Sequence, residues 1–332
     1  MSKLLEIEDL TLEFSERGEV TNRPLRGVTL EIAEGEILGV VGETGCGKSL
    51  TGLATLGLLP TGATPGGRIL IDGEEQRLGS PSKLRGNAIS IVFQNPGTAF
   101  NPLFTLGRQM QDVLARHKGL SRKQRTQRRQ HILGYLEQVG LPDPERVYDS
   151  YAHELSGGML QRAMIAMALV CEPRLLILDE PTTALDVTVA KQILDLVLSL
   201  RDRFGFGVML ITHNLGVVRE VCDRVAVLYA GRVIETGSTS QVLSRPAHPY
   251  TRGLLNALPA RHRQGEQLEA ITGQVPARLV DVEGCVFAAR CPIAVERCLT
   301  VDPQPVRVPG QLGEGAEHVA ACIRVAELEV AR

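Results

Sequence analysis

Apolar and polar positions alternate along residues 4–42, and this pattern is typical of β-strands. We expect turns between these strands at Gly18, Gly27 and Gly35. The last strand, ILGVV at 37–41, is apolar throughout and is predicted to be buried on both faces.

Two further apolar runs, LLILDE at 175–180 and GVMLITH at 207–213, lie on either side of a helical pattern at 189–204. The order strand, helix, strand predicts a parallel sheet and an α/β fold. A strand pair at 224–237, with its turn at Ala230 and Gly231, is predicted to close the sheet.

The remaining segments differ in composition. Residues 105–145 are basic, glutamine-rich and helical in pattern, and we interpret their charges as a solvated helix face. Beyond a Pro-rich segment, residues 260–332 are loop-rich with Gly, Pro and Cys. We therefore place a domain boundary near 245–260.

Composition excludes several classes of function. The chain has 332 residues and a formal net charge of −2, so it has no general basic field that would draw it to nucleic acid. Its first residues lack the pattern of a secretory signal, and we expect the protein to stay in the cytosol. The longest apolar run, 163–171, falls well short of the ~20 residues of a membrane-crossing helix. Any membrane association is therefore predicted to be peripheral.

The segment GETGCGKS at 42–49 follows a buried strand and precedes a helical pattern, which is the context of a phosphate-binding loop. Its glycines let backbone N–H groups converge on phosphates at the positive end of a helix. Lys48 is predicted to reach the β- and γ-phosphates of ATP, and Ser49 to ligate Mg²⁺. Cys46 is either a small filler or a thiol activated by the helix end and by Lys48. We favour the filler, and we predict that alkylation of Cys46 would block ATP binding.

Acids follow one of the apolar strands. Asp179 and Glu180 stand at its carboxyl end, the edge at which parallel sheets bind ligands. We predict that Asp179 holds the magnesium shell and that Glu180 polarises the attacking water. His213 ends the neighbouring apolar run and is predicted to lie near the γ-phosphate.

The segment LSGGMLQR at 155–162 predicts a second anion-binding helix start, with the helix beginning near Met159. A single ATP needs one phosphate loop. The second helix start therefore indicates that nucleotide is sandwiched between two chains, each offering Ser156, Gly157 and Gly158 to the other.

Together these motifs resemble the ATP-binding cassette (ABC) transporter ATPases over residues 1–245, in the order found in that family. The resemblance implies a P-loop NTPase core with a RecA-like mixed sheet, an antiparallel β subdomain, a helical subdomain at about 97–165 and a small C-terminal domain at 246–332. It adds Gln94 as a γ-phosphate sensor and magnesium ligand, Asp186 as a further nucleotide contact, and Phe14 as the aromatic residue under adenine. It also implies that nucleotide contacts extend along the whole phosphate loop: Gly42, Glu43, Thr44, Gly45, Cys46, Gly47, Lys48, Ser49 and Leu50.

QNPGTAFNP at 94–102, HPYTRGLL at 248–255 and the Cys-rich tail are similar to the oligopeptide, dipeptide and nickel importer branch. The tail cysteines are spaced C-x₅-C-x₆-C-x₂₃-C, unlike the tight pairs of a zinc ribbon. Four thiolates suit a 4Fe–4S cluster, which the resemblance supports. Disulfides and empty thiols stay open as alternatives for Cys285, Cys291, Cys298 and Cys322.

The resemblance implies a complex at the cytoplasmic face of the cell membrane: this chain, a second related ABC ATPase, two transmembrane subunits and an extracytoplasmic solute-binding protein. We expect ATP hydrolysis to drive the import of di- or oligopeptides, with nickel or metallophore import as the alternative. A soluble ABC ATPase of DNA repair or translation usually has two cassettes or coiled-coil insertions, which this chain lacks. A kinase would have no use for the LSGG segment. Export is also possible in principle, but the HPYT segment and the Cys-rich tail favour import.

Overall fold

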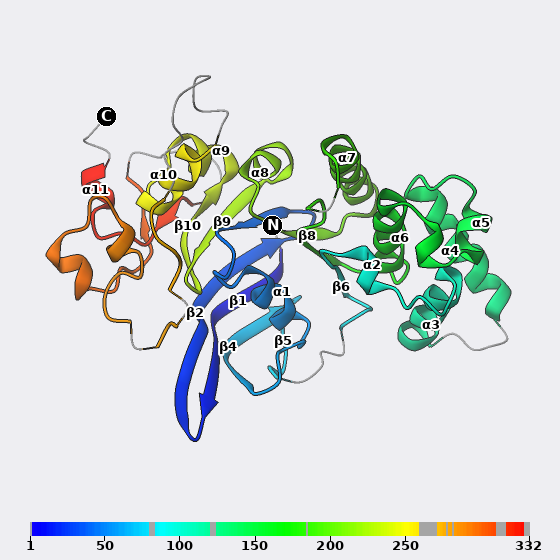
Figure 1. Cartoon of the computed structure of the whole chain (residues 1–332), viewed down its shortest axis with the longest axis horizontal. Helices are drawn as coiled ribbons and strands as arrows, with labels where there is room; N and C mark the ends of the chain where they lie inside the picture. Colours follow the sequence, from blue (N-terminus) through cyan, green and yellow to red (C-terminus); the bar gives the residue numbers. More distant parts are fainter. Residues whose placement is uncertain are drawn as a thin grey trace. The chain divides into compact units, whose positions relative to one another are not determined.

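The chain forms two compact units in the computed structural model, and each is described by itself (Figure 1). Unit 1 contains Met1–Leu4, Ala33–Gly35 and Pro81–Leu210, and unit 2 contains Leu5–Ile32, Glu36–Ser80 and Ile211–Arg332. The structure describes residues 2–79, 84–119, 124–183, 185–258, 271–276, 278–280, 282–309 and 317–328.

Unit 2 holds an antiparallel sheet in the order β2-β1-β4-β5. Its strands are β1 (Lys3–Glu16), β2 (Glu19–Ala33), β4 (Ala63–Ile71) and β5 (Glu74–Glu75). The turn at Gly18 is confirmed, but the turn predicted at Gly27 is wrong because Gly27 lies inside β2. Gly27 has a φ of +95°, and a Cβ there would come within 2.5 Å of Asp9 Oδ1. The close approach of Asp9, where β1 is irregular, therefore explains this glycine.

The second strand layer of unit 2 is built on β3 (Ile37–Val41), which is fully buried as predicted. It pairs in parallel with β9 (Arg224–Tyr229), and β9 pairs antiparallel with β10 (Arg232–Ser238). The turn at Ala230 and Gly231 is confirmed, with φ of 46° and 76°. The prediction that this pair closes the sheet is wrong, because β12 (Val319–Ala320) pairs with β10 and β11 (Val306–Arg307) pairs with β12.

The helices of unit 2 are short. They are α1 (Lys48–Thr55), α8 (Leu215–Val221), α9 (Thr239–Ser244), α10 (Pro249–Asn256), η4 (Ala288–Arg290), η5 (Glu296–Leu299) and α11 (Val325–Leu328). The tail is loop-rich where it is described, and Val308, Ala320 and Val325 pack with Ala247. The boundary expected near 245–260 includes the whole of α10. Positions 259 and 260 of this range lie outside the described residues. Contacts therefore group the tail with the phosphate-loop segment.

Unit 1 contains β6 (Ile89–Val92), which pairs in parallel with β7 (Leu175–Asp179). Its helices are α2 (Pro96–Ala99), α3 (Leu106–Lys118), α4 (Arg125–Gln138), α5 (Pro144–Asp149), η2 (Ala152–Glu154), α6 (Gly157–Leu169) and α7 (Val187–Phe204). The strand β8 (Gly207–Thr212) begins in this unit and ends in unit 2.

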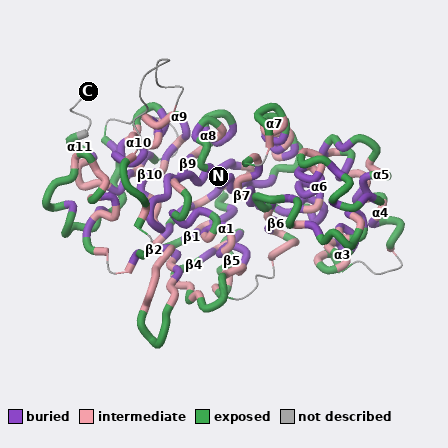
Figure 2. The backbone as a smooth tube through the Cα atoms, in the orientation of Figure 1, coloured by how far each residue is buried: buried purple, intermediate pink, exposed green. Residues whose placement is uncertain are grey.

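The predicted helical region is confirmed, although residues 120–123 of the stretch 105–145 lie outside the described residues. Leu106, Met110 and Leu114 of α3 are buried at helical spacing, which explains why this segment is an amphipathic helix. In unit 2, β9 is buried at every position after Arg224, and in unit 1 most residues of α6 from Leu160 onward are buried (Figure 2). Within the described ranges, no helix is both long and apolar enough to cross a bilayer.

Candidate nucleotide site

The phosphate loop connects β3 to α1, where the sequence predicts it. Gly42, Gly45 and Gly47 all have positive φ, which residues with a Cβ rarely adopt. A Cβ on Gly42 would come within 2.2 Å of Leu228 O, and one on Gly47 would come within 2.7 Å of Leu25 Cδ2. The loop therefore needs glycine both for its backbone conformation and for close packing.

Lys48 is folded back over this loop. Its Nζ donates to the carbonyl oxygens of Gly42 at 2.9 Å and Glu43 at 3.0 Å. The side chain is buried, so its ammonium group depends on these carbonyls for hydrogen bonds. Ser49, the next residue, is exposed at the start of α1.

Cys46 is a buried filler of the loop. Its side chain is fully buried, and its carbonyl accepts from the N–H of Gly231 at 2.9 Å. Burial raises the pKa of its thiol, although Lys48 acts in the opposite direction. The filler interpretation therefore has structural support, whereas a thiolate activated by Lys48 does not. The predicted block of ATP binding by alkylation stays a prediction.

Glu43 is held by the C-terminal region, which the sequence did not indicate. Its carboxylate accepts two hydrogen bonds from Arg290, Nη1 to Oε2 at 2.6 Å and Nη2 to Oε1 at 2.9 Å. Its backbone N–H donates to the hydroxyl of Tyr250 at 2.8 Å. The HPYT segment pointed to Tyr250 without giving it a role, and Arg290 is a single arginine in a loop-rich tail. Both are functional candidates that appear only in the structure.

In unit 1, the acid pair lies at the carboxyl end of β7 as predicted. Gln94 follows β6, and its Nε2 donates to Glu180 Oε2 at 3.1 Å. The hydroxyl of Thr183 donates to the same oxygen at 2.9 Å. Parallel pairing of β6 and β7 thus brings two predicted residues together, and Asp179 lies half-buried beside them.

The serine–glycine segment begins α6 two residues earlier than expected, at Gly157 rather than near Met159. Ser156 is the N-cap and accepts from the Met159 N–H at 3.4 Å. Ser156 and Gly157 are exposed. A Cβ on Gly158 would meet Val189 Cγ1 at 3.0 Å, whereas one on Gly157 would meet only Leu185 Cδ2, at 3.8 Å. Packing within the chain therefore explains why position 158 is a glycine, but it does not explain the glycine at position 157.

The remaining predicted residues occupy separate places. Asp186 is the N-cap of α7 and accepts from the Val189 N–H at 3.0 Å, so its side chain has a structural function in this unit. His213 follows β8 and is exposed. Phe14 lies on β1 opposite Ala63 of β4 and is half-buried. Leu50 is half-buried in α1, and Thr44 is exposed in the loop.

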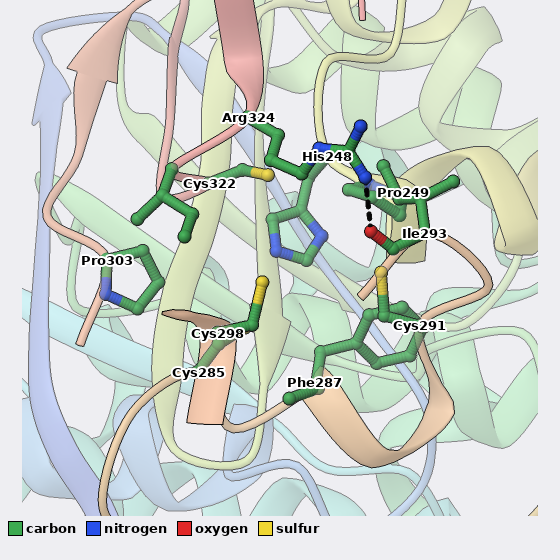
Figure 3. Close-up of a pocket in the computed structure, with 12 residues that line it drawn as sticks. His248, Pro249, Cys285, Phe287, Cys291, Ile293, Cys298, Pro303, Cys322 and Arg324 are labelled. Carbon is green, nitrogen blue, oxygen red and sulfur yellow. Dashed lines mark hydrogen bonds between the residues drawn. The ribbon is translucent and has the colours of Figure 1, made fainter. Parts of the chain in front are cut away.

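The four tail cysteines line one pocket together with His248, Phe287 and Arg324 (Figure 3). All four are free thiols. Burial raises the pKa of Cys285 to about 11, and Cys298, Cys322 and Cys291 raise it further through their charges. Burial also raises the pKa of Cys291 and of Cys322. Burial therefore disfavours the thiolate form of Cys285, Cys291 and Cys322.

Across the described part of the chain, no group of three or more His, Cys, Asp or Glu side chains is arranged to hold a metal ion. A single tetrahedral ion with metal–sulfur bonds of about 2.3 Å needs sulfurs within roughly 4 Å of one another. A four-iron cluster places each thiolate on a different iron and separates the sulfurs more widely. The tail thus supplies donors of the number and kind that a 4Fe–4S cluster uses, but within the described residues these thiols are not arranged as a metal site.

Comparisons with known proteins agree with this geometry. Residues 25–183 match the family model described as ABC transporter, and residues 234–298 match the model for the oligopeptide/dipeptide transporter C-terminal region. "Probable peptide ABC transporter ATP-binding protein y4tR" of Sinorhizobium fredii is 46% identical, over 98% of this chain and 96% of that protein. "Dipeptide transport ATP-binding protein DppD" of Bacillus subtilis is 43% identical, over 97% and 95%.

A solved structure of the ATP-binding cassette MJ0796, a dimer in a post-hydrolysis state with ADP and Pi, is also similar. It has a TM-score of 0.60 and 28% identity, and covers 71% of this chain and 98% of that one. The chain thus has the fold of an ABC cassette, with its antiparallel β and helical parts. It belongs to the ATP-binding subunits of ABC transporters and is an ABC-type ATPase.

Proposed function

We propose that this chain hydrolyses ATP to drive the import of di- or oligopeptides through membrane subunits. The observation that carries the proposal is a phosphate loop with Lys48 folded over its carbonyls, joined through Glu43 to a C-terminal region of the oligopeptide/dipeptide type. The names of the relatives from S. fredii and B. subtilis support peptides as the solute.

The nucleotide site is assigned residue by residue. Lys48 and the N–H groups of Gly42–Ser49 bind the phosphates of ATP, and Ser49, Asp179 and Gln94 hold Mg²⁺. Glu180 orients the attacking water, and His213 contacts the γ-phosphate. Phosphoryl transfer asks the protein mainly for positioning and for charges that stabilise the transition state. The hydrogen bond between Gln94 and Glu180 supports this division of roles.

A second cassette completes each site. Ser156 and Gly157 are exposed at a helix start, and packing in the chain itself does not account for Gly157. These residues bind the nucleotide held by a related ABC ATPase, and that ATPase offers its own serine–glycine segment in return. The dimeric state of the MJ0796 cassette with ADP and Pi supports this arrangement.

The ATPase pair works at the cytoplasmic face of the cell membrane beneath two transmembrane subunits, with a solute-binding protein outside. The helical region that follows Gln94 contacts the membrane subunits, so closure on ATP reorients the transport path. The test is co-purification followed by uptake in proteoliposomes with the solute-binding protein. ATP-dependent uptake of a di- or oligopeptide is expected. Uptake of nickel or a metallophore with no peptide uptake would contradict the assignment.

The tail thiols hold a 4Fe–4S cluster with a structural function in this proposal. Their shared pocket and their number support it. Anaerobically purified protein should contain about four iron and four acid-labile sulfide per chain, and Cys298→Ser should lower both. Full-length protein with four intact thiols and neither iron nor sulfide would contradict the cluster.

A further inference from the structure

The start of the phosphate loop is fixed at one residue, Glu43, by groups from the C-terminal region. The Glu43 carbonyl accepts from Lys48 and from the Cys46 N–H, at 3.0 and 3.3 Å. Its N–H donates to Tyr250, and its carboxylate pairs with Arg290. Every polar group of Glu43 thus has a partner, and two of these partners come from the C-terminal region.

Arg290 is itself held rigidly. Its side chain is only 7% exposed. Its Nε donates to Thr272 O at 2.9 Å, its Nη2 donates to Gly273 O at 3.2 Å, and its guanidinium carbon lies 5.7 Å from the centre of the Tyr229 ring. Because Arg290 is held in this way, its bidentate pair with Glu43 sets the direction of the Glu43 carboxylate and also neutralises its charge.

Glu43 is the second residue of the proposed phosphate loop, so its charge lies close to the site for a triphosphate. An unpaired carboxylate there would repel the phosphates, and it would also attract the Lys48 ammonium, which already lies at the Glu43 carbonyl. Both effects would weaken nucleotide binding. Arg290 prevents them by neutralising the carboxylate and turning it toward the tail.

The same two partners adjoin the cysteine pocket. His248 lines the pocket, and its Nδ1 accepts from the Tyr250 N–H at 3.1 Å (Figure 3). Arg290 immediately precedes Cys291, another pocket residue. The rings of Tyr229, Tyr250 and Phe287 pack together, with centroids 4.7 to 5.4 Å apart, and Phe287 also lines the pocket. The pocket is therefore connected to Arg290 through the adjacent residue Cys291, and to Tyr250 through the hydrogen bond with His248.

We propose that Arg290 and Tyr250 are positioning residues that clamp Glu43 and thereby set the affinity of the phosphate loop for MgATP, and that the cysteine pocket acts on nucleotide binding through this clamp. This inference rests on the proposed nucleotide site at Gly42–Ser49. It makes the tail a part of nucleotide binding rather than an appendage.

The first test measures Kd for MgATP in the full-length protein, using a fluorescent ATP analogue. Arg290→Met should raise Kd about tenfold, within the usual range of coupling between sites. In the double variant that combines Arg290→Met with Glu43→Gln, Kd should lie within about threefold of the Kd of Glu43→Gln alone. The carboxylate charge that weakens binding is absent from both proteins. Tyr250→Phe keeps the ring packing and removes only the hydroxyl, and it should raise Kd by a few-fold, roughly the effect of one hydrogen bond.

Arg307→Met is the matched control, because Arg307 lies in the same tail, is 75% exposed and pairs with Glu317. It should leave Kd unchanged. Melting temperatures of all variants identify any that fold poorly. A wild-type Kd in both Arg290→Met and Tyr250→Phe would overturn the clamp. So would an Arg290→Met defect that Glu43→Gln does not relieve. If the wild type binds no MgATP, the nucleotide site itself fails instead.

The second test concerns the pocket. Cys291→Ser should change Kd for MgATP in the wild-type background, and should produce no further change once Arg290→Met and Glu43→Gln are present. An equal shift in both backgrounds would show that the pocket acts by another route. No shift in the wild-type background would overturn the link between pocket and loop.

Discussion

The amide of Gln94 donates to the carboxylate of Glu180 across the ends of two parallel strands, at 3.1 Å. Glu180 has a φ of 47°, a conformation that non-glycine residues seldom adopt. Such backbone strain is typical of functional positions. The carboxylate is therefore held in a defined place directly after β7, as the role proposed for Glu180 requires.

Glu180→Gln should abolish most ATP turnover while keeping MgATP binding. The amide has nearly the same shape but is not a base, and general bases contribute about 100-fold or more to rates. Steady-state phosphate release and nucleotide binding on the same preparation provide the check. Glu137→Gln, an exposed residue of α4, is the control and should behave as wild type. Rapid steady turnover by Glu180→Gln would refute the role of Glu180.

Phe14 tests the assignment of the adenine site. Phe14→Ala should weaken MgATP binding about tenfold, since stacking of a base on an aromatic ring contributes about 1–3 kcal/mol. Phe14→Tyr should retain the affinity because its ring still stacks. Val20→Ala, at a half-buried position of the neighbouring strand β2, is the control. Equal affinities for ATP in Phe14→Ala and wild type would place the base elsewhere.

His248 makes stability depend on pH. Burial lowers the pKa of His248 to about 4, from 6.5, against an opposing effect of Glu235. The native state thus binds fewer protons than the unfolded state between these values, so stability is complete above about pH 6.5 and is lost as pH falls toward 4. The loss should reach about 3 kcal/mol in the free energy of unfolding.

Denaturant unfolding at several pH values measures this loss. In His248→Asn the side-chain oxygen can still cap α10, as His248 does, but no imidazole is left to titrate. The variant should therefore lose less stability than wild type between pH 6.5 and 4. His153→Asn, at an exposed position, is the control and should follow the wild-type curve. An unchanged pH dependence in His248→Asn would contradict the assignment.

Local pattern was enough to predict the elements that carry the phosphate loop and the acid pair. The strand at 37–41 is buried at every position, and Asp179 ends a strand that is buried up to that residue. These features follow from periodicity and from the glycine spacing of the loop. Parallel pairing of β6 with β7 brings Gln94 to Glu180, a contact that was not predicted from the sequence.

Long-range contacts could not be predicted in the same way. Glu43 and Arg290 are 247 residues apart, and nothing near Arg290 marks it as a partner of the loop. The pairing of β12 with β10 depends on two residues that are too few to show a period. Gly27 suggested a turn because glycine is common in turns, whereas the actual reason for this glycine is the close approach of the Asp9 side chain.

The shared nucleotide site is the central claim, and Gly157→Ala tests it most directly. The new methyl group would meet its own chain only at 3.8 Å, so the melting temperature should not fall. Gly134→Ala, at a helical position with nothing within 4 Å, is the matched control. In the assembled transporter, Gly157→Ala should reduce ATP turnover at least about tenfold through misplacement of the nucleotide, while Gly134→Ala should not. Wild-type turnover and wild-type ATP-dependent association of the subunits in Gly157→Ala would contradict the claim.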